Sequence, residues 1–323
     1  RIMIVITGGA GFIGSNLINF LFQKKNMSLA TVDGKNKKNE DYFSSNKILK
    51  IDPKDLDNFL EQNKNKIEII VHLGAVTSTV ENNLDLIIKN NIDLSIFIWN
   101  WCTINKKRLV YASSAATYGS GINKFDDNES RKYLSNLFPL NPYGWSKHIF
   151  DKFVYTKKKQ GFSPSQCVGL KFFNVFGPNE FHKNDMRSII LKIYQTVKRK
   201  SQVTLFKSHH PDYKNGEQLR DFIYVKDVVK VINWFIKNKE VNGLFNVGSG
   251  KPRSFNDIAK AVFLNCNFNS TIKYIDTPSS IRNQYQYYTK ANISKLRKYG
   301  YKEKFTSLEE GISDYIRNYL NNE

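Results

Sequence analysis

The chain has 323 residues, of which 41% are hydrophobic, and its formal net charge is +20 at pH 7. This length and apolar content predict a large core, in two domains or in one elaborated domain. No apolar run approaches the roughly 18 residues that a membrane span needs, so we expect no membrane partner. The lysines are scattered among asparagines without an arginine-rich tract, so the charge does not predict a nucleic-acid partner.

The cysteines and histidines also limit the class of protein. Cys102, Cys167 and Cys266 lie far apart and predict neither a disulfide framework nor a zinc site. No histidine makes a metal-binding spacing with a cysteine or another histidine, so no metal site is expected. The chain begins with "RIMIVITGG", a buried strand that leads into a glycine turn and does not resemble a signal peptide. These features predict a cytoplasmic protein in a reducing environment.

The apolar pattern predicts alternating strands and helices. Strand-like runs occupy residues 2–7, 29–33, 67–75 and 108–114. Helical segments are expected near residues 12–24, 55–64 and 82–104, and another follows "NPYGWSK". Later strand-like runs are "QCVGLKFFNVFG" and "LFNVGSG". Apolar strands that alternate with helices predict an α/β fold, a Rossmann-like doubly wound parallel sheet with helices on both faces.

A glycine-rich turn follows the first strand. "TGGAGFIGSN" places Gly8, Gly11 and Gly14 between a strand and a helix. Glycines let the backbone turn tightly and approach a pyrophosphate, with helix N–H groups directed at the phosphates. Asp33 ends the next strand about 20 residues later, where a carboxylate would hold the ribose of adenosine. The combination predicts a dinucleotide site.

The residues after this strand leave the choice between NAD and NADP open. Asp33 would repel a 2′-phosphate, which favours NAD. A short basic segment follows at once and would neutralise such a phosphate, with Lys35, Lys37 and Lys38. Both cofactors are compatible with this pattern.

From about residue 176 the pattern loosens into loops around shorter elements. We expect residues 1–175 to form the dinucleotide-binding domain, to which the chain returns near 203–206 and 220–250. Residues 176–323 are expected to form mainly a smaller α/β substrate-binding lobe, interleaved with those returns.

Two further segments carry groups that can move a proton. "YASSAATYG" places Ser113 and Ser114 at the carboxyl end of a predicted strand, where doubly wound sheets place their chemistry. "NPYGWSK" places Tyr143 four residues before Lys147, on one face of a helix. A lysine ammonium stabilises a neighbouring phenolate and lowers the pKa of the phenol. We therefore expect Tyr143 to be a base assisted by Lys147, with Ser114 binding the reacting oxygen.

The glycine turn, the strand-end serine and the Tyr-x-x-x-Lys pair together resemble the extended short-chain dehydrogenases/reductases. "FFNVFGP", "LRDFIYVKDVV" and "LFNVGSGK" are similar to later landmarks of nucleotide-sugar epimerases and dehydratases. In the dehydratases of this superfamily an Asp–Glu pair follows the serine position, whereas this chain has Ala115 and Ala116. The resemblance therefore implies an epimerase or a simple reductase.

More narrowly, the chain resembles the family of ADP-L-glycero-D-manno-heptose 6-epimerases from end to end. The resemblance lies in "TGGAGFIGSN", "YASSAATYG", "NPYGWSK", "FNVFGPNEFHK", "LRDF" and "QYQYYTKANISKLRKYGY". It implies an isomerase that inverts C6 of ADP-D-glycero-D-manno-heptose through a transient 6-keto sugar, for synthesis of lipopolysaccharide core precursors. It also implies NADP, tightly bound and regenerated at each turnover.

The same resemblance implies a second acid/base. The family carries a lysine in a Gly-His-Lys stretch, and this chain has Phe181, His182 and Lys183 at the matching place. We expect Lys183 to act as that second acid/base beside Tyr143, or to contact the cofactor and the substrate.

Further contacts follow from the resemblance residue by residue. The cofactor would be contacted by Gly8, Gly11, Phe12, Ile13, Gly14, Asp33, Gly34, Lys35, Leu73, Gly74, Ala75, Val76, Thr77, Asn90, Lys147, Val175 and Lys183. The substrate would be contacted by Ser114, Asn174, Asp185, Lys192, Phe206, Arg220 and Tyr285. The planar fork of Arg220 suits a diphosphate. Gly34, Asp185 and Lys192 depart from the residues that we associate with the family.

Two other functions stay open. A UDP-hexose 4-epimerase would use Tyr143 as its sole base and would need no role for Lys183. A non-catalytic dinucleotide sensor, or a nucleic-acid-binding protein on the same fold, would have no reason to keep Ser114, Tyr143 and Lys147 together. We expect a homo-oligomer whose partner is a small nucleotide sugar.

Overall fold

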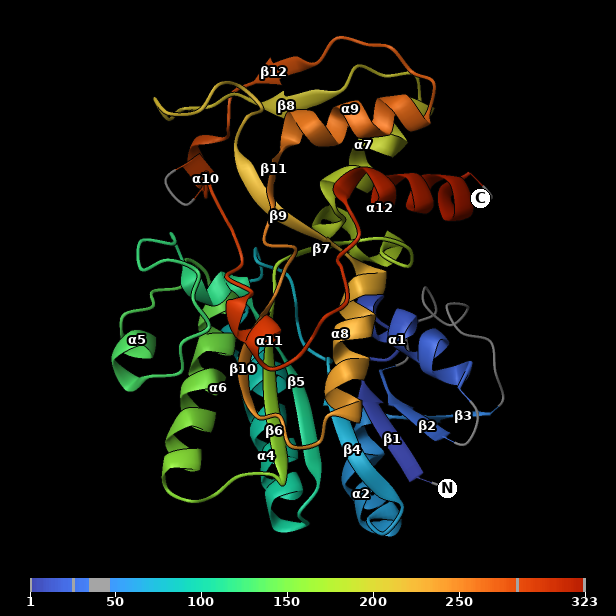
Figure 1. Ribbon diagram of the computed structural model, residues 1–323, viewed down its shortest axis with the longest axis vertical. Coiled ribbons are helices and arrows are strands. Elements are labelled where there is room, and N and C mark those ends of the chain that lie inside the picture. Colours follow the sequence, from blue (N-terminus) through green and yellow to red (C-terminus); the bar gives the residue numbers. More distant parts are fainter. Residues whose placement is uncertain (1, 25–26, 35–46, 283–284, 322–323) are drawn as a thin grey trace.

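The computed structural model describes residues 2–24, 27–34, 47–282 and 285–321 (Figure 1). Its main layer is a seven-stranded sheet in the order β10-β6-β5-β4-β1-β2-β3, in which every neighbouring pair is parallel. The strands are β1 (Ile2–Thr7), β2 (Met27–Val32), β3 (Ile48–Ile51), β4 (Ile67–His72), β5 (Arg108–Ser114), β6 (Gln166–Phe172) and β10 (Gly243–Val247). The predicted doubly wound parallel sheet is confirmed.

The helices cover both faces of this sheet (Figure 1). In the first half of the chain they are α1 (Phe12–Phe22), α2 (Leu56–Asn63), α3 (Leu84–Ile87), α4 (Leu94–Ile104), α5 (Arg131–Ser135) and α6 (Pro142–Lys159). In the second half they are α7 (Ile189–Lys198), α8 (Val225–Lys237), α9 (Phe255–Asn265), α10 (Ser279–Arg282), α11 (Ser294–Lys298) and α12 (Leu308–Tyr315).

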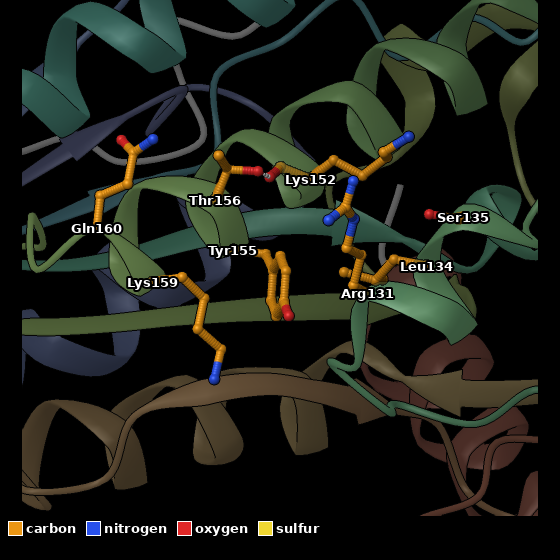
Figure 2. A pocket seen from close by; sticks show the side chains of 8 residues that line it. All are labelled: Arg131, Leu134, Ser135, Lys152, Tyr155, Thr156, Lys159 and Gln160. Atoms are coloured by element: carbon orange, nitrogen blue, oxygen red, sulfur yellow. Dashed lines mark hydrogen bonds between the residues drawn. The ribbon is translucent and has the colours of Figure 1, made fainter.

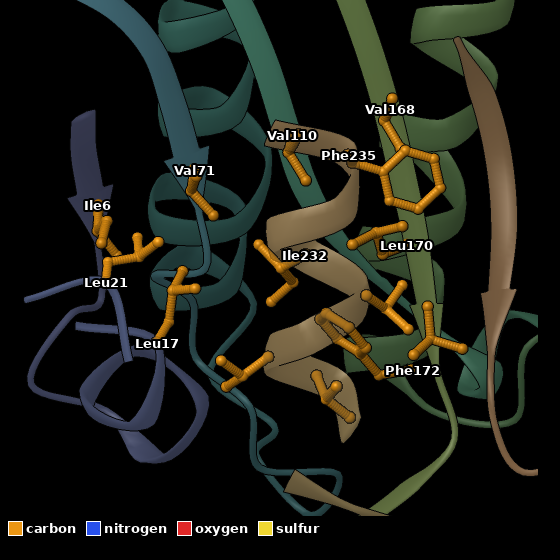
Figure 3. Packing of buried hydrophobic residues seen from close by; sticks show 14 of the residues in the cluster. Ile6, Leu17, Leu21, Val71, Val110, Val168, Leu170, Phe172, Ile232 and Phe235 are labelled. Atoms are coloured by element: carbon orange, nitrogen blue, oxygen red, sulfur yellow. The ribbon is translucent and has the colours of Figure 1, made fainter. Parts of the chain in front are cut away.

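Each face of the sheet has its own apolar core, because successive strand residues point to opposite faces. Figure 3 shows the first core, in which α1 and α8 pack on strand residues such as Ile6, Val71 and Val110. On the other face α2, α4 and α6 pack on residues such as Val5, Ile70 and Leu109. Full burial of one such side chain contributes about 1.5–3 kcal/mol. The near-continuous apolar strands of the sequence therefore reflect burial on both sides.

The expected helix at residues 82–104 is interrupted. A π-helical segment, Ile88–Asp93, separates α3 from α4. At this wider turn the buried Asn91 faces the loop after β4: its Oδ1 accepts from the Val76 N–H at 2.8 Å, and its Nδ2 donates to the Val76 carbonyl at 2.9 Å. The same amide group donates to the Ser146 hydroxyl at 3.0 Å, which ties this loop to α6.

A second lobe lies at the carboxyl edge of the main sheet, because β7 (Asn174–Phe176) begins two residues after β6 ends. Strands β7, β9 (Leu219–Tyr224) and β11 (Pro252–Ser254) form one small sheet, and β8 (Thr204–Phe206) pairs with β12 (Lys273–Ile275). Helices α7, α9 and α12 pack in the core of this lobe, at the top of Figure 1.

The interleaving of the two parts differs in two respects from the expectation. The segment 243–247 returns to the main sheet as β10, but residues 204–206 pair with β12 and residues 219–224 form β9 of the small sheet, both in the second lobe. A three-residue strand has too little apolar pattern to reveal its partner. The division into domains at residues 1–175 and 176–323 stays a prediction.

A long, apolar helix that could cross a bilayer does not occur within the part of the chain that the structure describes.

Candidate active site

The glycine turn joins β1 to α1 and lies against the end of β4. Gly8 has a φ of +71°, and a Cβ at this position would lie 2.7 Å from the Cα and N atoms of Gly74. A Cβ on Gly14 would lie 2.1 Å from the Gly8 carbonyl oxygen. Gly11, which has no side chain to cap the helix, precedes α1. The turn therefore presents backbone N–H groups at a helix N-terminus, the arrangement that accepts a pyrophosphate.

We expect Gly14→Ala to weaken dinucleotide binding at least tenfold and to destabilise the protein by about 1–3 kcal/mol, because the added methyl group collides with the turn. Titration with NADPH, followed by fluorescence, and thermal unfolding measure the two effects. Gln23→Ala, at the exposed C-terminal end of the same helix, is the control and is expected to change neither. An unchanged NADPH affinity in Gly14→Ala would contradict this account of the turn.

Asp33 closes the far side of the turn. Its Oδ1 accepts from the Ala10 N–H at 3.0 Å, and its Oδ2 accepts from the Thr31 hydroxyl. Burial raises the pKa of Asp33, although these hydrogen bonds oppose the shift. Among the residues that the structure describes, none would lie within 4 Å of a Cβ added at Gly34. Lys35, Lys37 and Lys38 lie outside the described residues.

Ser114 and Tyr143 come together at the carboxyl end of β5. Ser114 is the last residue of the strand, and its hydroxyl accepts from the Ala116 N–H at 3.1 Å. Helix α6 begins beside it, with Pro142 in the first turn and the Asn141 side chain capping the Gly144 N–H at 2.8 Å. The side chains of Tyr143 and Ser114 share a hydrogen bond. The cap and the proline thus place Tyr143 in the first turn, against the strand-end serine.

The pKa of Tyr143 moves opposite to our expectation. Burial raises it, and the hydrogen bond with Ser114 lowers it only in part. Lys147 lies one turn later and is 4% exposed, and its Nζ donates to the Ala112 carbonyl at 2.8 Å. Burial lowers the pKa of Lys147 to about 8, against the attraction of the Asp151 carboxylate. A sequence shows the spacing of this pair but not its desolvation, which here is the largest cause of the Tyr143 pKa shift.

Lys183 approaches the site from the other side. It belongs to the 3₁₀ segment Phe181–Met186, and its Nζ lies 5.2 Å from the ring centroid of Phe12, in the first turn of α1. Burial lowers the pKa of Lys183, whereas Glu180 opposes the shift. Glu180 is itself buried and accepts from the Ser188 hydroxyl at 2.6 Å and from the Tyr315 hydroxyl at 3.1 Å. The structure thus brings Lys183 beside the glycine turn, as a cofactor contact requires.

The remaining predicted cofactor residues divide into two groups. Residues Leu73, Gly74, Ala75, Val76 and Thr77 form the loop directly after β4, and Val175 lies on β7. Gly74 N–H donates to the Thr7 hydroxyl at 3.1 Å, so this loop is held against β1. Asn90, in contrast, lies in the π-helical segment, and its side chain donates to the Leu86 carbonyl of α3 at 2.8 Å. Its neighbour Asn91, which sequence analysis missed, holds the loop instead.

Three of the predicted substrate residues form a group in the second lobe. The guanidinium carbon of Arg220, on β9, lies 5.2 Å from the ring centroid of Tyr285. The rings of Tyr285 and Phe206 lie 6.2 Å apart, edge to face. Arg220 is 8% exposed. A buried guanidinium between aromatic rings suits a diphosphate with an attached base.

The other predicted substrate residues are arranged less closely. Lys192 Nζ donates to the Asp185 carbonyl at 2.6 Å, which joins the start of α7 to the segment that carries Lys183. Asn174 begins β7 and is exposed. The roles of all these residues stay predictions.

Two charged residues that were not predicted from the sequence lie behind Ser114 and Lys147. Asp151 on α6 and Lys171 on β6 are both buried, and their charged atoms lie 3.4 Å apart. Two signals for them were present in the sequence. Asp151 follows Lys147 by one helical turn, and Lys171 is the one charged residue in the apolar run "QCVGLKFF".

Two further observations concern other kinds of site. A hollow of about 520 Å³ lies between α5 and α6, away from the predicted site residues. Figure 2 shows Tyr155 there between the side chains of Arg131 and Lys159. The cationic side chains that line this hollow, Arg131, Lys152 and Lys159, contribute to the net positive charge of the chain. Within residues 2–24, 27–34, 47–282 and 285–321, no group of three His, Cys, Asp or Glu side chains could hold a metal ion.

Comparison with known proteins identifies the class to which this fold and site belong. Residues 4–248 match the family model described as the NAD dependent epimerase/dehydratase family. The structure of a UDP-N-acetylglucosamine 4-epimerase from Methanobrevibacter ruminantium M1 has a TM-score of 0.84 and 25% identity, and the match covers 100% of this chain and 99% of that one. The chain belongs to the NAD dependent epimerase/dehydratase family.

Two relatives identify the group within this family. The ADP-L-glycero-D-manno-heptose-6-epimerase of Fusobacterium nucleatum is 41% identical over 98% of both chains. The structure of the enzyme of the same name from Helicobacter pylori is 29% identical, with a TM-score of 0.78 over 98% of this chain and 96% of that one. Within the larger family, the chain therefore groups with the ADP-L-glycero-D-manno-heptose-6-epimerases. The predicted resemblance and the predicted isomerase class are confirmed.

Proposed function

We propose that this protein inverts C6 of ADP-D-glycero-D-manno-heptose to give the L-glycero epimer, through a transient 6-keto sugar, with NADP as cofactor. The observation that carries the proposal is the presence of two partly buried ionisable groups from different elements. Tyr143 belongs to α6, and Lys183 belongs to the segment beside α1. Inversion of one carbon by oxidation and reduction needs a proton acceptor for one orientation of the carbon and a proton donor for the other.

The chain's own groups divide the work. The bound nicotinamide supplies the acceptor for the C6 hydride and the donor that returns it. Asp33 and the glycine turn would hold the adenosine ribose and the pyrophosphate of the cofactor. Ser114 would bind the reacting oxygen through its hydroxyl, while Tyr143 removes the proton from that oxygen. Lys147 would hold the nicotinamide ribose of the cofactor and stabilise the Tyr143 phenolate. Lys183 would then protonate the oxygen once the opposite face of C6 is presented.

Arg220 supports the assignment of a nucleotide sugar as substrate. Its buried guanidinium would pair with the diphosphate, beside the rings of Tyr285 and Phe206. The product would serve the synthesis of lipopolysaccharide core precursors, and the unpaired, buried thiols of Cys102 and Cys167 suit a cytoplasmic location. Cell fractionation tests the cytoplasmic location. Recovery of the protein in the fraction of secreted proteins would overturn it.

The preference for NADP over NAD rests on the family resemblance. We expect purified protein, after denaturation, to release NADP at close to one equivalent per chain. Release of NAD alone would reverse the preference without affecting the proposed reaction.

Proton NMR tests the proposed reaction. ADP-D-glycero-D-manno-heptose is incubated with purified protein and no added cofactor, and growth of the L-glycero epimer is expected. An unchanged spectrum, even with NADP and NAD supplied, would overturn the heptose assignment and direct the test to UDP-hexoses.

We also propose that the protein is a homo-oligomer. Exposed apolar side chains lie along α3, the π-helical segment after it and α6, including Leu84 at 57%, Ile88 at 44% and Ile149 at 44%. They line a hollow of about 400 Å³ together with Pro142 and Trp145. A contiguous exposed apolar surface of this kind marks a protein interface, and a twofold axis would place the same surface of two copies together.

Ile149→Glu is therefore expected to produce a smaller species in light scattering after size-exclusion chromatography, because a charge would be buried at the interface. The matched control is Ile104→Glu, at the exposed end of α4, which is expected to leave the mass unchanged. A monomeric unsubstituted protein would overturn the proposal.

A further inference from the structure

A buried ion pair lies behind the groups assigned to proton transfer. Lys171 on β6 and Asp151 on α6 have side chains that are 1% and 0% exposed, and Lys171 Nζ lies 3.4 Å from Asp151 Oδ2. Lys171 also donates to the Thr117 hydroxyl at 2.7 Å and lies 4.4 Å from the ring centroid of Tyr118. Thr117 lies three residues after Ser114, so the pair is bonded to the segment that follows Ser114.

The pair is connected to Lys147 through one strand. Lys147 and Asp151 lie one turn apart on α6 and bond to three consecutive residues of β5. Lys147 donates to the Ala112 carbonyl at 2.8 Å, and Asp151 accepts from the Tyr111 hydroxyl at 3.0 Å and the Ser113 hydroxyl at 2.7 Å. Ser114 is the next residue of the strand. The contacts of the pair thus determine where α6 lies relative to Ser114.

Stability alone does not account for such a pair. Two charges lose their hydration when they are buried, and apolar residues of similar volume often pack at least as stably. The proposed site, in contrast, needs a buried charge. Lys147 must stay an ammonium to hold the nicotinamide ribose of the cofactor and to stabilise the Tyr143 phenolate. Burial alone disfavours that ammonium.

We propose that Asp151 is a positioning residue that holds Lys147 in its charged form, and that Lys171 in turn keeps Asp151 ionised. This inference deepens the proposed function, and rests on it for the role of Lys147. The Asp151 carboxylate raises the pKa of Lys147 against the effect of burial. Burial raises the pKa of Asp151, and Lys171 is the largest influence that lowers it.

Other ionisable groups act on this cluster from several neighbouring elements. From the loop after Tyr118, the buried Asp127 raises the pKa of Lys171, and burial raises the pKa of Asp127 itself to about 6. From β4, His72 has its pKa lowered to about 3, chiefly by burial, so it is neutral near pH 7. From β5, burial raises the pKa of Tyr111, and the same holds for Cys167 on β6 and Tyr118. From α6, the pKa of His148 is lowered to about 4 by burial and by Lys171. Asp151 is thus the group in this cluster whose charge favours the ammonium of Lys147.

The test is Asp151→Asn, with NADPH affinity measured by fluorescence between pH 6 and pH 9. Loss of the carboxylate lowers the pKa of Lys147, so its charge is lost at lower pH. NADPH affinity should fall above a certain pH, as Lys147 loses its proton. We expect this pH to be about one unit lower in Asp151→Asn than in the unsubstituted protein, the lower end of the usual effect of an opposite charge. The alkaline limb of the epimerisation rate should move in the same direction. Because NADPH binding needs no heptose, failure of the proposed reaction would leave this test intact.

Two further variants separate positioning from support of the fold. The double variant Asp151→Asn/Lys171→Met removes both charges; we expect it to unfold at a higher temperature than Asp151→Asn and to keep the shifted limb. Asp227→Asn removes another buried carboxylate, which bonds to Thr306, and should leave the limb unchanged. Wild-type pH dependence in the folded double variant, or in a folded Asp151→Asn protein, would overturn the proposal. If Asp151→Asn does not fold, the double variant alone decides.

Discussion

Tyr143→Phe will lower the rate of epimerisation by about a hundredfold to ten-thousandfold, the range that general acid–base groups contribute. The phenol oxygen shares a hydrogen bond with Ser114 at the end of β5, where the reacting oxygen of the substrate is proposed to bind. The phenylalanine ring keeps the packing at the start of α6, so the loss should fall on kcat. Initial rates from NMR, together with NADPH affinity, separate these effects.

The matched control is Tyr155→Phe, on the same helix but in the hollow beside α5, which should keep full activity. If Tyr143→Phe retained more than half of the activity while its cofactor affinity was normal, Tyr143 would not be an acid/base of the reaction.

Lys183→Met is expected to have an effect of the same order, about a hundredfold or more on kcat. Burial lowers the pKa of Lys183, so its ammonium gives up a proton more readily than that of an exposed lysine. The Nζ lies over Phe12 at the start of α1, whereas Tyr143 belongs to α6. Each group would therefore serve one orientation of C6, and removal of Lys183 should stop the inversion while Tyr143 still supports proton transfer to the other orientation.

Lys198→Met, in the last turn of α7, is the matched control and should have wild-type rates. If Lys183→Met inverted the substrate at the wild-type rate, Tyr143 would be the sole base. That outcome would favour the mechanism that we associate with UDP-hexose 4-epimerases.

The fold was largely predictable because apolar periodicity reports burial directly. The runs at residues 2–7 and 108–114 became β1 and β5 with the same bounds. Strand β3 was missed, since Ile48–Ile51 is only four residues long and interrupted by Lys50. The partner of Thr204–Phe206 was missed because pairing in a small lobe depends on contacts between distant segments.

Proximity in the site was predictable where one element ends beside another, as with Ser114 and Tyr143. Asp151 and Lys171 were not, because their pairing depends on the register of β5 and β6, which sets Ser113 opposite Lys171. The direction of the Tyr143 pKa shift was also beyond the sequence, since it follows from desolvation in the folded chain.

Transfer of deuterium tests the central claim, inversion by oxidation and reduction at C6, most directly. The substrate is ADP-D-glycero-D-manno-heptose with deuterium at C6, in ordinary water, and the product is analysed by proton NMR and mass spectrometry. The account predicts the L-glycero epimer with deuterium still at C6, because the same hydride leaves and returns. Inverted product that carries hydrogen from water at C6 would contradict it and would indicate deprotonation of the carbon.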